Sequence, residues 1–350
     1  MRPSAFSLAV ACCVLASGLP AAKVVVVAGG GTGGPGSAAT GAELRVPFGT
    51  GFDAAGNMYI VEMSKGNRLL RVGADGVLQH IAGTGETGFA GDGGPALEAQ
   101  FNGPHNLAVL PDGNVLIGDT WNGRIRKVDV RAGTVDSIPG YSVPAEKAKG
   151  AGPYCITLDP AGKTLYVADL RQIHAIDLAT GTTRVVAGNG EKGRPEDGAR
   201  ATEAPLVDPR AVAADGRGNL YILERGGHAL RVVEGGGKIR TVVNANGTKG
   251  ISNDGESAAG ARLNGPKHLC IDRDDSVIIA DAENHIIVRY LPREKKVRRV
   301  AGTGARGSAG AGGDPLRCQL AQPHGVTVHP KSGELYITDS MNHRVLKIVR

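Results

Sequence analysis

Short apolar segments bounded by turn residues recur along the whole chain. Six of them read GNMYIVE, GNVLIGD, KTLYVAD, GNLYILE, DSVIIAD and GELYITD. Each has the length of a strand rather than a helix, and β-branched and aromatic residues, which favour sheets, dominate most of them. Each is followed by a turn and another apolar run. This pattern predicts an all-β chain.

A proline opens each repeat of this pattern, at successive spacings of 57, 49, 56, 57 and 57 residues. These prolines are Pro47, Pro104, Pro153, Pro209, Pro266 and Pro323. After each proline come a first strand, the segment above, a third strand such as RIRKVDV (124–130), and a fourth that ends in Ala-Gly. Four strands repeated at a fixed period indicate propeller blades. We therefore predict one six-bladed β-propeller of four-stranded blades.

The two ends of the chain complement each other. VVVAGG (25–30) has the fourth-strand pattern ahead of the first complete repeat, whereas the last repeat stops after its third strand. The sequence thus predicts that an N-terminal strand completes the last blade and closes the ring. This pairing would also cover two sheet edges that are otherwise open to aggregation.

The first 22 residues have the pattern of a secretory signal peptide. Arg2 precedes an apolar stretch over 5–15, and small residues lead up to Ala22. The stretch is shorter than the ~20 residues of a spanning helix, so we expect no stable membrane anchor. We expect residues 1–22 to be removed and 23–350 to form the propeller, secreted or in the periplasm.

Composition narrows the partners. The 54 glycines fit many tight turns, and the net charge of +6 favours anionic partners mildly. One tryptophan and few stacking aromatics argue against nucleic acid. Beyond the predicted signal peptide, Cys155, Cys270 and Cys318 are odd in number and lack Cys-x-x-Cys spacing, which predicts no disulfide framework or metal site and leaves their redox state open.

Three segments carry a family resemblance: DTWNGRI at 119, DAENHII at 281 and DSMNHRV at 339 are similar to the NHL-repeat signature. The connecting segment AGTGETGFAGDGGPALEAQFNGP (82–104) resembles loops of secreted bacterial NHL proteins and of the teneurin propeller. The resemblance implies the same propeller fold. Its members include protein-binding scaffolds, RNA binders and a metal-dependent peptide-amidating lyase, so fold alone selects no activity.

One carboxylate recurs at the end of the second strand of every repeat. The six are Glu62, Asp119, Asp169, Glu224, Asp281 and Asp339. A group needed once for catalysis would not recur six times, so we interpret them as structural acceptors for backbone N–H groups of the following turn.

The residue after each proline differs from blade to blade and should lie at the mouth of the central channel. These residues are Phe48, His105, Tyr154, Arg210, Lys267 and His324. The set contains no acid and up to four potentially cationic groups, which favours an anionic ligand. We therefore predict a non-enzymatic binding module that uses this mouth and the surrounding loops to bind a protein, a glycan or a small anionic ligand, without a cofactor.

The alternative is a metal-dependent enzyme similar to the amidating lyase. That resemblance implies zinc held by histidines near a tyrosine and an arginine, for which His105, His268, His324, Tyr154 and Arg210 are the candidates here. His268 is one residue out of phase with the other two, and alternate residues of a strand point to opposite faces. This departure weakens the match. A calcium-dependent lactonase would need inward carboxylates, which the mouth lacks.

Overall fold

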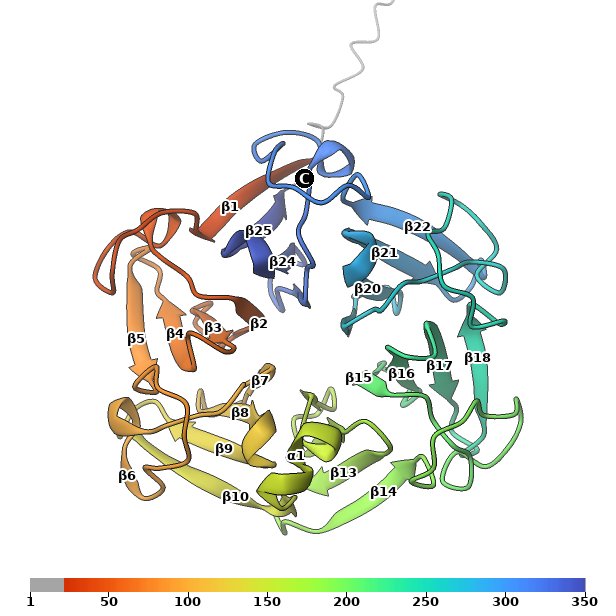
Figure 1. Cartoon of the computed structure of the whole chain (residues 1–350), viewed down its shortest axis with the longest axis horizontal. Coiled ribbons are helices and arrows are strands. Elements are labelled where there is room, and N and C mark those ends of the chain that lie inside the picture. The colour runs from red at the N-terminus through yellow and green to blue at the C-terminus, as the bar shows by residue number, and fades with distance from the viewer. Residues whose placement is uncertain (1–21, 350) are drawn as a thin grey trace, which may run out of the picture.

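The protein, described here over residues 22–349 of a computed structural model, is a ring of six antiparallel sheets around a central channel (Figure 1). This confirms the predicted all-β six-bladed propeller. The predicted signal peptide lies outside the described residues apart from Ala22. Over 22–349 no helix is long and apolar enough to cross a membrane.

Each blade is named here from its inner strand to its outer strand. Blade 1 contains β2 (Pro47–Phe52), β3 (Met58–Glu62), β4 (Arg68–Val72) and β5 (Leu78–Ala82). Blade 2 contains β7 (Asn106–Val109), β8 (Val115–Asp119), β9 (Arg124–Asp129) and β10 (Thr134–Ser142), with the short β6 (Gly94–Pro95) at its outer edge. Blade 3 contains β11 (Cys155–Leu158), β12 (Thr164–Ala168), β13 (Ile173–Asp177) and β14 (Thr183–Ala187).

The second half of the ring repeats this order. Blade 4 contains β15 (Pro209–Ala214), β16 (Leu220–Glu224), β17 (Ala229–Val233) and β18 (Ile239–Val243). Blade 5 contains β19 (His268–Ile271), β20 (Val277–Asp281), β21 (Ile286–Leu291) and β22 (Lys296–Ala301). Blade 6 contains β23 (Gly325–Val328), β24 (Leu335–Asp339), β25 (Arg344–Val349) and β1 (Lys23–Gly29).

The N-terminal strand closes the ring as predicted. In Figure 1, β1 lies beside β25, and the pairing runs from Lys23 opposite Val349 to Gly29 opposite Arg344. Val24 is fully buried in an apolar cluster that blades 5 and 6 share. The first strand of the chain and the last therefore belong to one blade.

The hydrophobic core lies between neighbouring blades. In β3, β8, β16, β20 and β24 every residue is buried. These are the second strands of their blades. Each sheet packs one face against the preceding blade and the other face against the following blade, so these strands read as continuous apolar runs rather than alternating ones.

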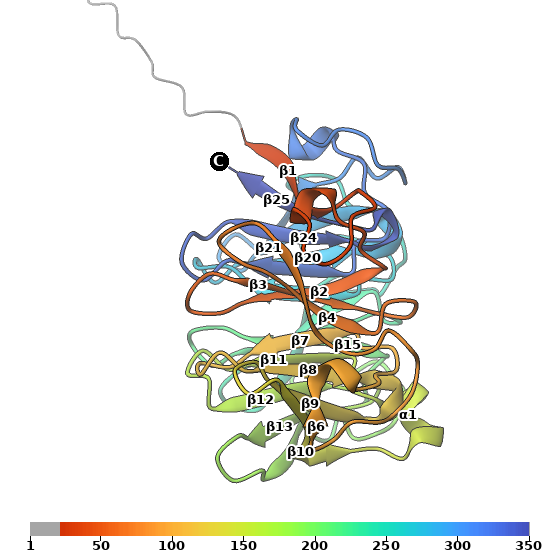
Figure 2. The same ribbon diagram turned by 90° about the vertical axis from the view of Figure 1, so that its left-hand side faces the viewer.

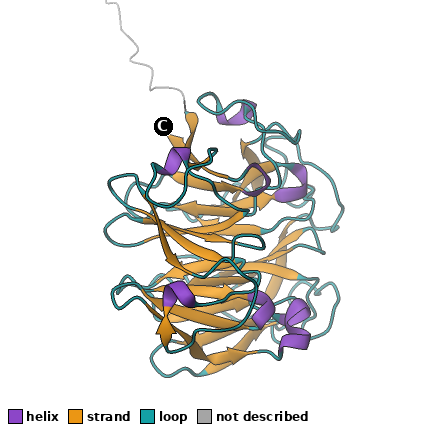
Figure 3. Ribbon diagram, turned by 60° about the vertical axis from the view of Figure 1, so that its left-hand side comes forward, coloured by secondary structure: helices purple, strands orange, loops and turns teal. Residues whose placement is uncertain are grey.

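The connections between blades gather on one face of the disc. Every inner strand begins at the same end of the channel, so the outer-to-inner loops and the turns that follow each second strand lie at that end. These turns include η3 (Thr120–Asn122), η4 (Ala282–Asn284) and η6 (Ser340–Asn342). Figure 2 shows the disc from the side, and Figure 3 shows that helix is confined to short pieces within loops. In the repeat of 49 residues, helix α1 (Ala145–Ala151) replaces the long loop.

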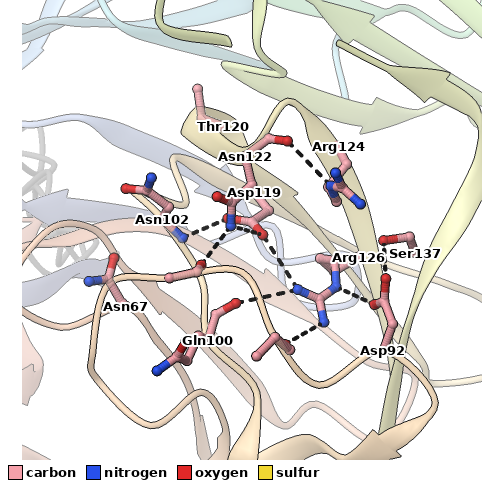
Figure 4. A network of polar contacts seen from close by, with 12 residues as sticks. Asn67, Asp92, Gln100, Asn102, Asp119, Thr120, Asn122, Arg124, Arg126 and Ser137 are labelled. Atoms are coloured by element: carbon pink, nitrogen blue, oxygen red, sulfur yellow. Dashed lines mark hydrogen bonds and ion pairs between the residues drawn. The ribbon is translucent and has the colours of Figure 1, made fainter. Parts of the chain in front are cut away.

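The recurring carboxylates are structural, but the expected partner was wrong in five of the six blades. In Figure 4, one oxygen of Asp119 accepts the backbone N–H of Asn102, 2.7 Å away in the preceding loop, and the other accepts the Asn122 amide at 2.8 Å. The other four carboxylates of this kind are Glu62, Glu224, Asp281 and Asp339. Among the six, only Asp169 accepts backbone N–H groups of its following turn, those of Arg171 and Gln172. Each of the five therefore anchors the loop that enters its blade, a contact that spans 17 or 18 residues.

Histidines join neighbouring blades at three of the six junctions. His228, His285 and His343 adopt positive φ at the start of a third strand. In each, Nδ1 accepts the backbone N–H of the residue before the next blade's proline, at 3.0 to 3.1 Å. Because Nδ1 must be unprotonated to accept, these contacts require neutral rings.

Candidate functional site

The six residues that follow the prolines meet at the loop-bearing end of the channel. The Phe48 ring stacks on His324 with centroids 3.9 Å apart, and meets His105 edge-on at 5.2 Å. His105 contacts Tyr154 at 4.8 Å, and the guanidinium carbon of Arg210 lies 4.0 Å from the centre of the Tyr154 ring. These contacts form a continuous arc from blade 6 through blades 1, 2 and 3 to blade 4.

Lys267 of blade 5 fills the remaining position. Its Nζ lies 3.5 Å from Glu283 Oε1, and its side chain is only 10% exposed. Burial lowers the pKa of Lys267 and that of His324, and the positive charges of Arg210 and Lys267, respectively, lower them further. The structure thus brings all six predicted residues together.

The ring has a buried side and an accessible side. Phe48, His105 and Tyr154 are 5%, 7% and 7% exposed, whereas Arg210, Lys267 and His324 keep part of their surface open. The Tyr154 hydroxyl donates to the Lys149 carbonyl of α1, which fixes the buried arc from outside. A ligand that reaches the mouth would therefore meet the two cations and one histidine, while the aromatic rings support them.

The two ring histidines are neutral, which lowers the expected number of cations from four to two. His105 Nδ1 lies 2.7 Å from the Gly103 carbonyl oxygen, and His324 Nδ1 lies 2.9 Å from that of Gln322. A carbonyl can only accept, so Nδ1 carries the proton in both rings. Burial, followed by the nearby cationic side chains, holds both pKa values well below the usual range. The charge of the mouth comes from Arg210 and Lys267.

These two cations are held in unfavourable surroundings. Burial lowers the pKa of Arg210 to about 10. Burial, with the positive charges of Arg210 and Arg225, lowers that of Lys267 to about 8. Within residues 22–349, Arg210 has no carboxylate at ion-pair distance, because the nearby Asp208 pairs with Arg171 and Lys192. An incoming anion would supply the counter-charge that Arg210 lacks.

The channel does not run through as one space. Asn106 of blade 2 reaches His268 of blade 5 on the opposite side of the ring, with Nδ2 2.9 Å from Nε2. Asn106 Oδ1 accepts the backbone N–H of Ile156. Burial lowers the pKa of His268 to about 4, so this ring is neutral too. The pair forms a polar bar across the channel, one residue further along the inner strands than the mouth.

This bar separates the candidate histidines from one another. His268 lines the space on the far side of the bar, and its Nε2 is engaged by Asn106, whereas His105 and His324 belong to the mouth. In the part of the chain that the structure describes, no three His, Cys, Asp or Glu side chains are placed to hold one metal ion. The phase difference seen in the sequence therefore corresponds to a different layer of the channel.

Beyond the bar, a cavity of about 560 Å³ opens toward the opposite face. It is lined by inner-strand residues such as Thr50, Thr157, Cys270 and Thr327, and Arg273 lies among the residues around it. Neither this cavity nor the bar above it was predicted from the sequence. The signal lay two residues after Pro104 and Pro266, where Asn106 and His268 stand.

Two family models match the chain: the teneurin NHL domain over residues 140–307 and the NHL repeat over residues 101–128 and 320–348. The chain belongs to the NHL-repeat propeller family. Among its relatives, human Teneurin-1 is 29% identical over 246 residues, covering 65% of this chain but 8% of the relative. Protein SUPPRESSOR OF QUENCHING 1, chloroplastic, from Arabidopsis thaliana is 26% identical over 282 residues, covering 75% of this chain and 26% of the relative.

Solved propellers agree in fold. A crystal structure from Bacteroides ovatus, described as an auxiliary nutrient binding protein, superposes with a TM-score of 0.68 at 18% identity, covering 94% of this chain and 76% of that one. A Bacteroides thetaiotaomicron protein of unknown function gives a TM-score of 0.71 at 14% identity, with the same coverage. At such low identity these likenesses show the architecture alone.

Proposed function

We propose that this NHL propeller is an exported, non-enzymatic binding module that holds an anionic group at its channel mouth. The observation that carries the proposal is the mouth itself: Arg210, without a carboxylate partner among the described residues, and the largely buried Lys267 lie at the starts of neighbouring inner strands. Hydrogen bonds from cationic donors to a carboxylate or phosphate are short and strong, and they gain strength where water is partly excluded. The description of one structural neighbour as nutrient-binding agrees with a binding role.

The surroundings of the mouth add positive charge. Arg225 and Lys249 are exposed on the loop-bearing side of blade 4, and neither forms an ion pair among the residues described. Burial lowers the pKa of His228, and the charges of Lys249 and Arg225 lower it further. Such a sector would attract an anion at a distance and guide it to Arg210 and Lys267. The loops around the mouth would contact the remainder of a larger partner, a protein or a glycan that carries the anionic group.

Calorimetric titration of residues 23–350 with small carboxylates, phosphate and sulfate tests the proposal. We expect at least one anion to bind, and Arg210→Gln or Lys267→Met to weaken it about 10- to 100-fold, which corresponds to one hydrogen bond to a charged group. Arg273→Gln removes the same charge at the opposite end of the channel and should leave binding unchanged. Absence of binding by every anion, or equal binding by all three variants, would overturn the proposal.

A further inference from the structure

Lys267 is the one member of the mouth that can form a covalent bond as a nucleophile through its amine. The backbone holds it in place, since its N–H donates to the Ala280 carbonyl at the start of the inner strand. Its side chain is largely shielded from water. A neutral lysine amine attacks carbonyl carbon, and lysines that are desolvated or placed beside another cation are the ones that do so readily.

Burial and two like charges favour loss of the Lys267 proton, and together they outweigh the opposing effect of the Glu283 carboxylate. Arg210 and Arg225 act on it as like charges, and His324, packed against Phe48, is neutral and adds no counter-charge. Glu283 is the carboxylate at contact distance, and its other oxygen accepts the Gln322 amide at 2.9 Å, which holds it in position. Glu283 can therefore take the proton that leaves the ammonium group. The lowered pKa of Lys267 agrees with this balance, which leaves about a tenth of the amine neutral at pH 7.

Arg210 supplies the other half of the site. Its guanidinium lies over the Tyr154 ring, and Tyr154 is itself fixed to α1, so the charge is held in one place. A planar guanidinium pairs with a carboxylate through two parallel hydrogen bonds. Because Arg210 and Lys267 lie at the starts of neighbouring inner strands, we expect an acid bound to Arg210 to be within reach of the amine.

We propose that Lys267 forms an imine with a small acid that carries a carbonyl group next to its carboxylate, such as an aldehyde acid or a 2-oxo acid. This inference rests on the proposed anion site. Glu283 accepts one proton from the ammonium, and the amine nitrogen then bonds to the carbonyl carbon. The carbonyl oxygen takes that proton back from Glu283 and a second one from the nitrogen, and leaves as water. Ammonium plus carbonyl thus give a protonated imine plus water, with no oxidation or reduction. Arg210 holds the carboxylate throughout, and water reverses the step.

Reductive trapping tests the inference. The protein is incubated with glyoxylate, the imine is reduced with cyanoborohydride, and the modified lysine is located by peptide mass spectrometry. We expect Lys267 to be labelled at least tenfold faster than the exposed Lys331, with a rate that rises with pH to a midpoint near 8. Lys267→Arg should abolish the fast label, and Lys331→Arg should leave it unchanged.

Glycolate, the same acid without the carbonyl, separates this inference from the proposed function. It should compete with labelling, and Arg210→Gln should slow labelling about tenfold. If glycolate and glyoxylate bind in calorimetry and require Arg210 but no adduct forms on Lys267, the imine is wrong and the anion site stands. If neither acid binds and no adduct forms, the imine is wrong, and the anion site fails with it if phosphate and sulfate do not bind either. Equal labelling of Lys267 in the Arg210→Gln variant would overturn the role of Arg210.

Discussion

Blades 5 and 6 differ in how they compensate the same buried carboxylate. Asp339 accepts backbone and asparagine N–H bonds and also the Arg344 Nε at 2.8 Å, with both side chains buried. Asp281 makes the same two kinds of N–H bond, but Ile286 stands opposite it where Arg344 stands in blade 6. Burial, without a cation to offset it, raises the pKa of Asp281 to about 7.

We therefore predict that Arg344→Ile makes blade 6 behave like blade 5. Near pH 8 the free energy of unfolding of the variant should be lower by about 3–5 kcal/mol, the usual cost of breaking a buried ion pair and leaving one charge behind. Near pH 5 the loss should fall to about 2 kcal/mol, because the variant then lacks only the two hydrogen bonds from the guanidinium to the carbonyls of Ser308 and Gln319. At that pH Asp339 can take up a proton instead of remaining charged.

The direction of this pH dependence follows from how many protons the folded and unfolded states bind. Burial already raises the pKa of Asp339 above its ordinary value, and removing Arg344 raises it further. Between the unfolded and folded pKa values the folded state binds more protons, so stability falls as pH rises through the folded pKa. Urea unfolding at both pH values measures this. Arg298→Ile removes an exposed pair with Glu294 and should cost under about 1 kcal/mol at either pH. Equal losses for Arg344→Ile at pH 5 and pH 8 would refute the reasoning.

Three further predictions concern closure, inter-blade contacts and metal. Deleting residues 23–28 should lower the melting temperature measured by circular dichroism, and should lower it by more than Val24→Ala does. Val24→Ala should reduce the free energy of unfolding by about 1–3 kcal/mol. An unchanged melting temperature in the deletion variant would show that β1 does not close the ring. His285→Ala should lower the free energy of unfolding in urea by about 1 kcal/mol above pH 7 and by less near pH 5. Burial lowers the pKa of His285, and only its neutral ring accepts the N–H of the next loop. A loss independent of pH would contradict this. Elemental mass spectrometry should find far less than one zinc per purified chain, whereas stoichiometric zinc lost in His105→Ala and His324→Ala would favour the enzyme alternative.

The sequence was sufficient for the architecture because each blade repeats the same local signals. The six prolines mark where inner strands begin, so they locate the residues of the mouth even without knowledge of the ring. The N-terminal strand was predictable for the same reason, since its pattern matches the fourth strand that the last repeat lacks.

Other features depend on the closed ring and leave no local signal. The contact between Asn106 and His268 joins residues 162 positions apart across the channel. The neutral state of His105 follows from its burial by neighbouring blades, and a backbone carbonyl determines which ring nitrogen carries the proton. The recurrence of the carboxylates indicated a structural role, but it did not identify their partners. In five of the six blades the backbone N–H that the carboxylate accepts lies 17 or 18 residues earlier in the chain, beyond any turn motif.

The central claim, an anion held between Arg210 and Lys267, is tested most directly by locating an anion in crystals. Crystals of residues 23–350 soaked in selenate would show the anion by its anomalous scattering. The account predicts a peak within hydrogen-bond distance of the Arg210 guanidinium and the Lys267 amine, lost in Arg210→Gln. An empty mouth at saturating selenate, or a peak only at the opposite end beside Arg273, would contradict it.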